Sequence, residues 1–144
     1  MKISIAEFED LMATALPFGQ LLGLKLEAIE ETHVDMRARF ANDHLRPGGT
    51  VSGPVMMGLA DAAVYALILS HIGPVELAVT TNLNINFLRK PEPADLLARA
   101  TMLKLGKRLA VAEVSIYSDT FDTQKVAHAV ATYSIPPLAT TATG

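Results

Sequence analysis

The chain has 144 residues, half of them hydrophobic, and a formal net charge of −3 at pH 7. Its length suits one domain with its own hydrophobic core, and its negative charge argues against a general nucleic-acid-binding surface. The sequence has no cysteine, which excludes disulfides, thiolate metal ligands and a cysteine nucleophile. Acidic residues near the start argue against a secretory signal, so we expect a cytoplasmic protein.

The N-terminal part of the chain predicts a helix followed by a β-hairpin. Ser4 is a suitable N-cap for a helix that extends to about Leu16 and ends at Pro17. Apolar and charged residues then alternate over residues 24–40, which predicts two strands with a turn at 30–32. A polar, glycine-rich loop is expected after this hairpin.

A long apolar segment, residues 54–72, predicts a helix in the middle of the chain. Glycine followed by proline gives a start signal at Gly53 and a stop signal at Gly73. The segment is long enough to span a membrane, but it contains Asp61 and His71, and strand-like segments follow it. A core helix that is enclosed by protein therefore explains it better than a membrane span.

Four strands are expected after this helix. In the first of them Leu83, Ile85 and Phe87 share one face, and three asparagines occupy the other. The last three strands are separated by short turns, which predicts an antiparallel meander. The expected strands span residues 77–88, 96–105, 109–117 and 126–135.

Together these elements predict an α+β domain over residues 1–136. A helix that is apolar on nearly every side has to be enclosed, and a curved antiparallel sheet of about six strands wrapped around one long central helix achieves this. The last residues, 137–144, are rich in threonine and alanine and show no periodic pattern, which predicts a disordered tail.

Asp61 is the one charged side chain in the first part of the apolar helix. A buried lone carboxylate is costly unless it is hydrogen-bonded or lines a wet cleft. Asp61 is therefore either catalytic or structural, in the second case bonded to a backbone amide or to Tyr65, or placed at a subunit contact. Gly53 starts the helix, where unpaired amides suit a developing oxyanion, although an ordinary helix cap is the simpler interpretation.

The spacing of Gly53 and Asp61 constrains how they can act together. Eight residues of helix separate them by roughly 12 Å. A base and an oxyanion donor must each come within ~3 Å of the reacting group, so one helix cannot supply both to one carbonyl. Two helices that run antiparallel across a twofold axis can. If the pair is catalytic, a dimer is required.

Four motifs occur in the order found in one family of enzymes. They are TVSGP at 50–54, LADAA at 59–63, NINFLRKP at 84–91 and GKRLAVAE at 106–113. With them, the chain resembles the phenylacetate-pathway (PaaI-like) type of hotdog-fold thioesterase over roughly residues 20–136. The resemblance rests on four motifs in sequence over a matching order of strands and helix.

The resemblance implies hydrolysis of an acyl-CoA thioester without a cofactor, coenzyme A being part of the substrate. The family's glycine amide corresponds to Gly53, and its acidic residue, which attacks the carbonyl or activates water, corresponds to Asp61. The chain departs from the family at Ser52, which replaces a histidine and can still donate a hydrogen bond. Arg46 replaces an asparagine or glutamine and can hold a charged acyl tail or a phosphate, and Pro54 stands where a second glycine is usual.

Further substrate-binding candidates lie near these motifs. Two basic pairs at a strand end and a turn can contact the phosphates of coenzyme A, or can be ordinary solvated charges. Asn86 can face the ligand, solvent or another subunit, and Tyr65 can line an acyl pocket or belong to the core. The candidates of this group are Tyr65, Asn86, Phe87, Arg89, Lys107 and Arg108, with Lys90 beside Arg89. The histidines lack metal-ligand spacing, so no metal site is expected.

Three functions remain open from the sequence. The first is a thioesterase, the second is a non-catalytic or regulatory module that binds acyl-CoA, and the third is a hotdog dehydratase. The dehydratase would need a histidine in the site, and Ser52 argues against it. We expect a homodimer through the strand that contains Leu83 and Phe87, which assembles further into a dimer of dimers. No nucleic-acid partner and no membrane span are expected.

Overall fold

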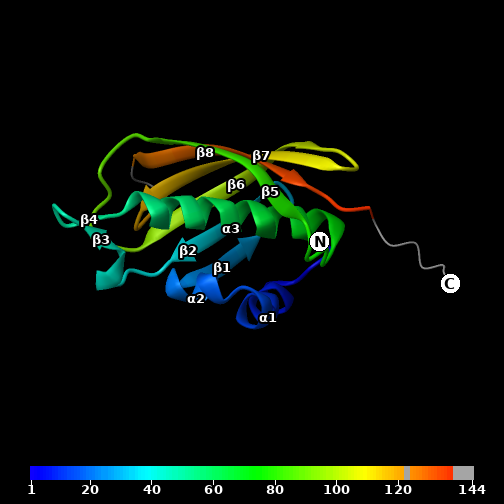
Figure 1. Ribbon diagram of the computed structural model, residues 1–144, viewed down its shortest axis with the longest axis horizontal. Helices are drawn as coiled ribbons and strands as arrows, with labels where there is room; N and C mark the ends of the chain where they lie inside the picture. The colour runs from blue at the N-terminus through cyan, green and yellow to red at the C-terminus, as the bar shows by residue number, and fades with distance from the viewer. Residues whose placement is uncertain (122–123, 138–144) are drawn as a thin grey trace.

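The computed structural model describes residues 1–121 and 124–137. It shows one antiparallel sheet curved around a central helix, which confirms the predicted α+β arrangement (Figure 1). Of the predicted tail, all but Pro137 lies outside the described residues. The elements are α1 (Ile5–Ala15), α2 (Pro17–Leu21), β1 (Leu24–Ile29), β2 (His33–Ala38), η1 (Asn42–His44), β3 (Leu45–Arg46), β4 (Thr50–Val51), α3 (Gly53–Ile72), β5 (Val79–Phe87), β6 (Leu96–Leu105), β7 (Leu109–Ser118) and β8 (Lys125–Ser134).

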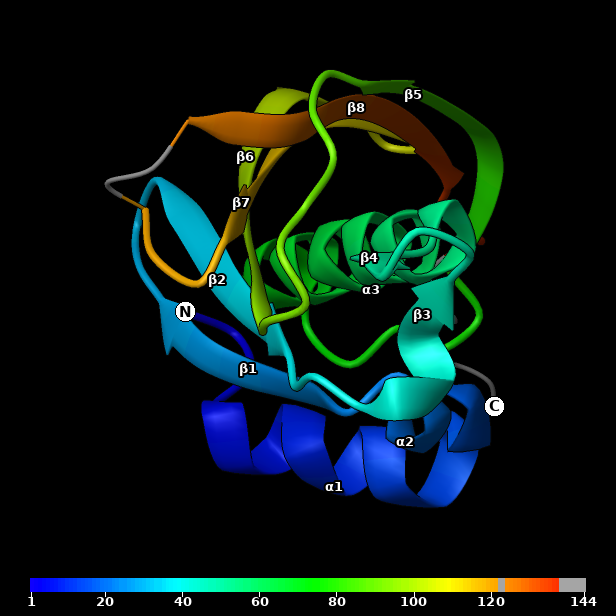
Figure 2. The same ribbon diagram turned by 90° about the vertical axis from the view of Figure 1, so that its left-hand side faces the viewer.

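The sheet has six strands in the order β1-β2-β6-β7-β8-β5, so β1 and β5 form its two edges. Seen along α3, the sheet wraps around this helix, and α1 and α2 lie beneath β1 on the other side (Figure 2). Alternate residues of β2, β6, β7 and β8 point inward and pack on α3, as expected for a sheet with one buried face. This wrapping buries most of the side chains of α3.

The central helix begins and ends where the sequence signals predict. Pro54 lies in its first turn, and Gly73 caps its C-terminus with a φ of 93°, a conformation that favours glycine. Within the described chain α3 is the one helix long and apolar enough to cross a membrane, yet 67% of its apolar window is buried inside the fold. Its apolar sequence is therefore explained by its place in the core.

One narrow face of α3 is not covered by the sheet. Pro54 and Met57 are exposed on this face, and Gly58, Asp61 and Ala62 are partly buried. Their spacing of three or four residues places them along one side of the helix. The Asp61 carboxylate therefore lies on the accessible face of the core helix and is not sealed inside the core.

The N-terminal region contains one helix more than predicted. Ser4 caps α1 as expected: its Oγ accepts a hydrogen bond from the amide of Glu7, whose side chain accepts one from the amide of Ser4. Pro17 ends α1, but it also begins α2, because proline is well suited to the first turn of a helix, where its missing N–H has no partner to lose. The single predicted helix is therefore two helices with a bend at Pro17.

The predicted polar loop contains a short 3₁₀ helix and a two-residue hairpin. Arg46 pairs with Thr50 across this hairpin, which turns at Gly48 and Gly49, both with positive φ. The ring of the buried His44 contacts the carbonyl oxygen of Leu21 at 3.0 Å and so ties this segment to the end of α2. The hairpin fixes Arg46 beside the start of α3.

A bulge near the start of β5 changes which side chains point inward. Within the described residues β5 pairs only with β8, and the register shifts between Thr80 and Asn82. Beyond the bulge Leu83 and Ile85 pack against the core, and the asparagines lie on the opposite face, as predicted, where they are exposed. The bulge allows Thr80 to face the interior on the same side as Leu83.

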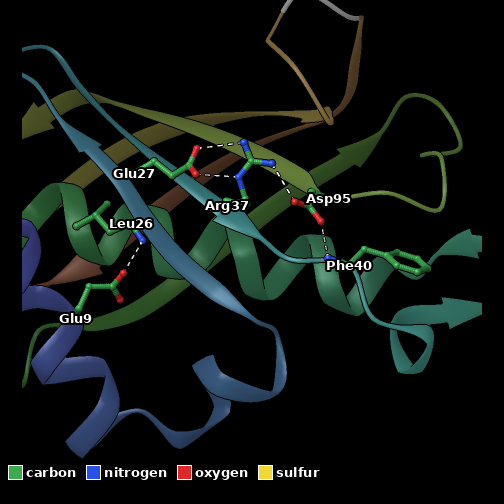
Figure 3. A network of polar contacts seen from close by, with 6 residues as sticks. All are labelled: Glu9, Leu26, Glu27, Arg37, Phe40 and Asp95. Atoms are coloured by element: carbon green, nitrogen blue, oxygen red, sulfur yellow. Dashed lines mark hydrogen bonds and ion pairs between the residues drawn. The ribbon is translucent and has the colours of Figure 1, made fainter.

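A polar network around Arg37 and a separate hydrogen bond to Glu9 hold the N-terminal helices and strands together (Figure 3). Arg37 donates to Glu27 at 2.8 Å and to Asp95 at 3.0 Å, and the other oxygen of Asp95 accepts from the amide of Phe40 at 2.7 Å. Glu9 of α1 accepts a hydrogen bond from the amide of Leu26 at 3.2 Å, next to a bulge in β1. This last bond occupies an amide of the edge strand and docks α1 on it.

Candidate active site

Two hollows lie along the accessible side of α3. The first, the Asp61 cavity, has a volume of about 270 Å³ and lies between α3, the helices α1 and α2, the start of β5 and the end of β8. The second, the Gly53 groove, has a volume of about 440 Å³ and lies between the start of α3, the β3–β4 hairpin and the segment after β5. The two predicted catalytic positions, Asp61 and Gly53, therefore line different hollows of one chain.

The Asp61 carboxylate is held at one of its oxygens. Its Oδ1 accepts hydrogen bonds from the hydroxyl of Thr80 and, at 2.8 Å, from the hydroxyl of Tyr133, which also lies 3.0 Å from the Asp61 carbonyl oxygen. No described residue donates a hydrogen bond to Oδ2. The carboxylate is thus fixed in orientation while one oxygen stays available for chemistry.

The structure does not pair Asp61 with Tyr65. The Tyr65 hydroxyl donates instead to the backbone carbonyl of Glu76 at 2.9 Å, while its ring lies 6.2 Å from that of Tyr133. Both tyrosines line the Asp61 cavity. Tyr65 therefore contributes ring surface to the cavity, and the bond to the carboxylate comes from Tyr133.

The surroundings of Tyr133 favour the neutral, donating form of its hydroxyl. Its side chain is only 2% exposed, and burial raises the pKa of Tyr133 well above its ordinary value. The negative charge of Asp61 raises this pKa further. Burial likewise raises the pKa of Tyr65, with a smaller contribution from Glu76. Deprotonation is disfavoured at both positions, so the hydroxyl of Tyr133 keeps its proton for the carboxylate.

Sequence reasoning did not identify Thr80 and Tyr133. Thr80 falls in a predicted strand, but the bulge that directs it inward has no signature in the local sequence. Tyr133 does carry a signal, because it continues the inward-facing series of small residues on β8. A tyrosine on a buried face needs a partner for its hydroxyl, and Asp61 was the available acceptor.

The Gly53 groove contains an unused backbone donor. Gly53 is the first residue of α3, and no described residue accepts a hydrogen bond from its amide. A Cβ on Gly53 would lie 3.3 Å from the ring of Phe87, so a side chain at this position would crowd the groove. Ser52, the N-cap residue, is partly buried and its side chain makes no capping bond. The helix dipole adds positive potential here, which suits a negatively charged oxygen.

The Gly53 groove is also cationic. Arg46, Arg89 and Lys90 line it, and none of the three forms an ion pair with a described residue. Arg89 and Lys90 also line a neighbouring hollow of about 400 Å³ that extends toward the β7–β8 turn. The two basic residues therefore line both hollows, although Glu92 and Asp119 also line the second one, so the more cationic of the two is the Gly53 groove.

The other predicted binding residues are spread over the molecule. Phe87 is 49% exposed at the edge of the Gly53 groove, whereas Asn86 lies on the exposed outer face of β5, away from both hollows. Lys107 and Arg108 lie at the β6–β7 turn, where Arg108 exchanges two hydrogen bonds with Ile135 after β8. This turn is beside the start of β5, so it is at the opposite end of that strand from Arg89.

The site offers a carboxylate with one free oxygen and a free amide at a helix start, the two groups required for acyl transfer. The described residues contain no cluster of histidine, aspartate or glutamate that could hold a metal ion. Within one chain the two groups are separated by eight residues of helix, about 12 Å. They can act on one carbonyl only if they come from two subunits.

Known proteins with the same fold and related sequences place the chain in a family. The family model of the thioesterase superfamily matches residues 48–123, just over half of the chain. The structure of a candidate thioesterase from a Silicibacter species is similar with 43% identity and a TM-score of 0.84, covering 94% of this chain and 93% of that one. A mutant of the phenylacetic acid degradation protein PaaI from Thermus thermophilus is similar with 26% identity and a TM-score of 0.72, covering 83% of this chain and 99% of that one.

A candidate esterase from Saccharolobus solfataricus is 28% identical over 116 residues, which are 80% of this chain and 75% of the relative. The family model includes the central helix α3 and the strands β5 to β7. The chain is therefore a member of the thioesterase superfamily, with the hotdog fold and a PaaI-like arrangement.

Proposed function

We propose that the protein hydrolyses acyl-CoA thioesters to a carboxylic acid and coenzyme A. The observation that carries this proposal is the state of Asp61, whose Oδ1 is held by two hydroxyl donors while its Oδ2 has no partner among the described residues. No buried side-chain oxygen of the described residues lacks a partner, so this Oδ2 is accessible and is not sealed in the fold. An oriented carboxylate that lines a cavity is suited to act on a substrate.

The proposed reaction uses the carboxylate and the amide together. In one route Asp61 removes a proton from water, whose oxygen attacks the thioester carbonyl carbon. In the other route the carboxylate itself attacks, and water later cleaves the resulting anhydride. In both, the amide of Gly53 stabilises the negative carbonyl oxygen, the C–S bond breaks, and the thiolate of coenzyme A leaves and takes up a proton.

The proposed active site is shared between two subunits. The free edge of β5 is suited to antiparallel pairing with its own copy across a twofold axis, and the exposed apolar residues Val79, Phe87 and Leu88 lie on or next to it. Such pairing sets the two α3 helices antiparallel. The Gly53 groove of one subunit then adjoins the Asp61 cavity of the other. Further assembly into a dimer of dimers remains part of the proposal.

The same pairing accounts for the positions of the basic residues. Arg89 and the Lys107–Arg108 turn lie at opposite ends of β5, so a twofold axis across β5 brings the turn of one subunit toward Arg89 of the other. We propose that Arg46, Arg89 and Lys90 contact the phosphates of coenzyme A, with Lys107 and Arg108 supplied from the second subunit. No further cofactor enters this reaction, and the expected compartment is the cytoplasm.

A second candidate function is suggested by Ser52. This residue occupies the position of the family's histidine, and its side chain makes no capping bond. In a thioesterase its hydroxyl is free to donate to the substrate carbonyl. In the alternative, the protein binds acyl-CoA as a regulatory module without hydrolysing it.

Hydrolysis assays with wild type and Asp61→Asn distinguish these functions. Asparagine keeps the shape of the side chain and an acceptor for Thr80 and Tyr133, but it cannot act as a base or nucleophile. We expect wild-type turnover of acyl-CoA, and a fall in kcat of about 100- to 10,000-fold for the variant with binding retained. A wild type that binds an acyl-CoA in calorimetry and never hydrolyses it would establish the binding module instead.

A further inference from the structure

The Asp61 cavity has one wall that comes from outside the family match. The match covers residues 48–123, which include the α3 and β5 sides of the cavity. The facing wall comes from α1, α2 and the residues next to them. Its apolar members are Met12, Leu16, Phe18, Leu22 and Leu24. The α3 and β5 sides of the cavity thus fall within the family match, whereas Tyr133 of β8 and the facing N-terminal wall fall outside it.

The cavity contains no positive charge. Its ionisable lining residues, among those the structure describes, are Asp61 and Glu76 and the two tyrosines, whose pKa values are raised by burial. An acyl group with its own carboxylate would meet two acids and no cation. Repulsion and the cost of desolvating that carboxylate would exclude it. The charge pattern selects a neutral acyl group.

The volume of the cavity limits the size of that group. An apolar cavity of about 150 Å³ is large enough to hold benzene. The Asp61 cavity, at about 270 Å³, has room for a ring with a short linker or for a straight chain of moderate length. The mostly apolar lining stabilises such a group in proportion to the area that it removes from water.

We propose that α1 and α2 form the wall that selects the acyl group, and that they restrict the enzyme to neutral, apolar acyl chains of about six to eight carbons or an aryl group of similar volume. This inference rests on the proposed thioesterase function. In this proposal Leu16 and Gly19, which line the N-terminal wall of the cavity, determine the size of the acyl group that fits.

The wall is held firmly against the catalytic helix. A Cβ on Gly58 of α3 would lie only 2.4 Å from Cδ1 of Leu22, so glycine at this position lets α2 pack directly on α3. Glu9 ties α1 to the amide of Leu26 from the outside. A wall fixed on both sides has a defined distance to Asp61, and a defined distance sets an upper limit on acyl length.

Gly19 and Leu16 allow this limit to be moved in both directions. A Cβ on Gly19 would lie 3.6 Å from Leu24 and 3.7 Å from Met12, which are ordinary contacts, so Gly19→Ala adds a methyl group to the wall without strain. Alanine also favours the helix over glycine. Leu16→Ala removes side-chain volume from the wall and enlarges the cavity.

The experiment measures kcat/KM for butyryl-, hexanoyl-, octanoyl-, dodecanoyl-, phenylacetyl- and glutaryl-CoA. For wild type we expect kcat/KM to rise about fourfold per methylene up to six to eight carbons, which corresponds to about 0.8 kcal/mol per buried CH₂. Dodecanoyl-CoA should be slower than octanoyl-CoA, and glutaryl-CoA should be slower than hexanoyl-CoA by at least about 100-fold. Gly19→Ala should shift the optimum to shorter chains and Leu16→Ala to longer ones.

The control is Leu103→Ala, the same type of change at a leucine that is 53% exposed on β6 and lines neither hollow. It should leave the profile unchanged, and circular dichroism checks that each variant is folded. Turnover of octanoyl-CoA with a profile that neither wall variant alters would overturn the inference while leaving the thioesterase intact. Equal turnover of glutaryl- and hexanoyl-CoA would do the same. If no CoA ester is hydrolysed by wild type, both proposals fail.

Discussion

The two ends of the accessible face of α3 differ in nearly every physical property. At the Gly53 end the groove is cationic, it exposes a backbone amide, and Arg46, Arg89 and Lys90 have no ion-pair partner in the part of the chain that the structure describes. At the Asp61 end the cavity is mostly apolar, has no cation among its described lining residues, and holds a carboxylate with hydroxyl groups. A thioester of coenzyme A has the same asymmetry, with an anionic carrier joined to an acyl group.

One helix therefore carries both an oxyanion donor and a base, but the two lie too far apart to form a complete active site within one subunit. Gly53 provides a donor with no base within reach, and Asp61 provides a base with no oxyanion donor beside it. A twofold axis that sets two copies of α3 antiparallel brings unlike ends together and yields two equivalent sites. The following predictions test this arrangement, from the largest expected effect to the smallest.

Mixed dimers test directly whether the two ends act across subunits. Asp61→Asn removes the base, and Gly53→Val places a side chain against Phe87 and fills the oxyanion position. We expect each variant alone to lose about 100-fold or more in kcat. A mixed dimer, isolated with two affinity tags, has one intact site, so it should recover about half of the wild-type turnover.

The mixed dimer would stay inactive if Gly53 and Asp61 acted within the same subunit. If both groups act within one chain, every chain in the mixed dimer carries a defect, and the activity should stay at the level of the single variants. Each variant homodimer, carrying both tags and isolated in the same way, is the control for activity that the tags themselves introduce.

Tyr133→Phe tests whether the hydroxyl at the Asp61 end positions the carboxylate. The variant removes the 2.8 Å donor and leaves the ring in place. Because the Asp61 carboxylate then keeps only the Thr80 hydroxyl as a side-chain donor and is held less firmly, we expect kcat to fall about tenfold. Tyr65→Phe, which breaks only the bond to the Glu76 carbonyl, should lower kcat much less.

The raised pKa of Tyr133 gives this test a second measurement. A pKa above the ordinary value of a phenol means that the neutral, donating form persists as the pH rises through 10. The kcat of wild type should therefore not fall near pH 10 through ionisation of Tyr133, and the basic limb of its pH–rate profile should match that of Tyr133→Phe. A basic limb that the variant abolishes would show that the hydroxyl ionises and would contradict the assigned role.

Much of the fold could be predicted from the sequence because its signals are local. Glycine followed by proline marks both ends of α3, and alternating patterns mark the strands from β5 to β8, with bounds that agree to within a few residues. The catalytic candidates Asp61 and Gly53 could be named for the same reason. A charge in an apolar helix and a glycine at its start are visible without knowledge of the partner strands.

The parts that could not be predicted depend on contacts between distant segments. Thr80 reaches Asp61 only because a bulge shifts the register of β5 against β8, and Tyr133 reaches it from 72 residues further along the chain. The role of Pro17 was misjudged because proline both ends one helix and begins another. The sequence did not indicate that α1 and α2 line the Asp61 cavity, because they reach it only after they fold back beneath β1 (Figure 2).

Arg89→Ala tests whether the cationic Gly53 groove binds the phosphates of coenzyme A. Arg89 lines both the Gly53 groove and the neighbouring hollow, so its loss should weaken binding of the phosphates more than it affects the chemistry. We expect KM to rise about fivefold with kcat changed less than twofold, and the salt dependence of KM to become shallower. Lys104→Ala, at an exposed position of β6 outside both hollows, should change neither value. Equal effects of the two variants would show only a loss of general positive charge.

Ser4→Ala gives the smallest expected effect and separates stability from catalysis. The Ser4 hydroxyl accepts the amide of Glu7 at 3.0 Å and caps α1, which carries part of the acyl wall on its far end. Loss of this cap should lower the free energy of unfolding by about 1 kcal/mol, measured by urea denaturation with an unchanged slope. Because the first turn of α1 lines neither hollow, the preference among acyl chains should be unaltered. A changed acyl preference would mean that the wall depends on the whole of α1 and not on its packing against α3 alone.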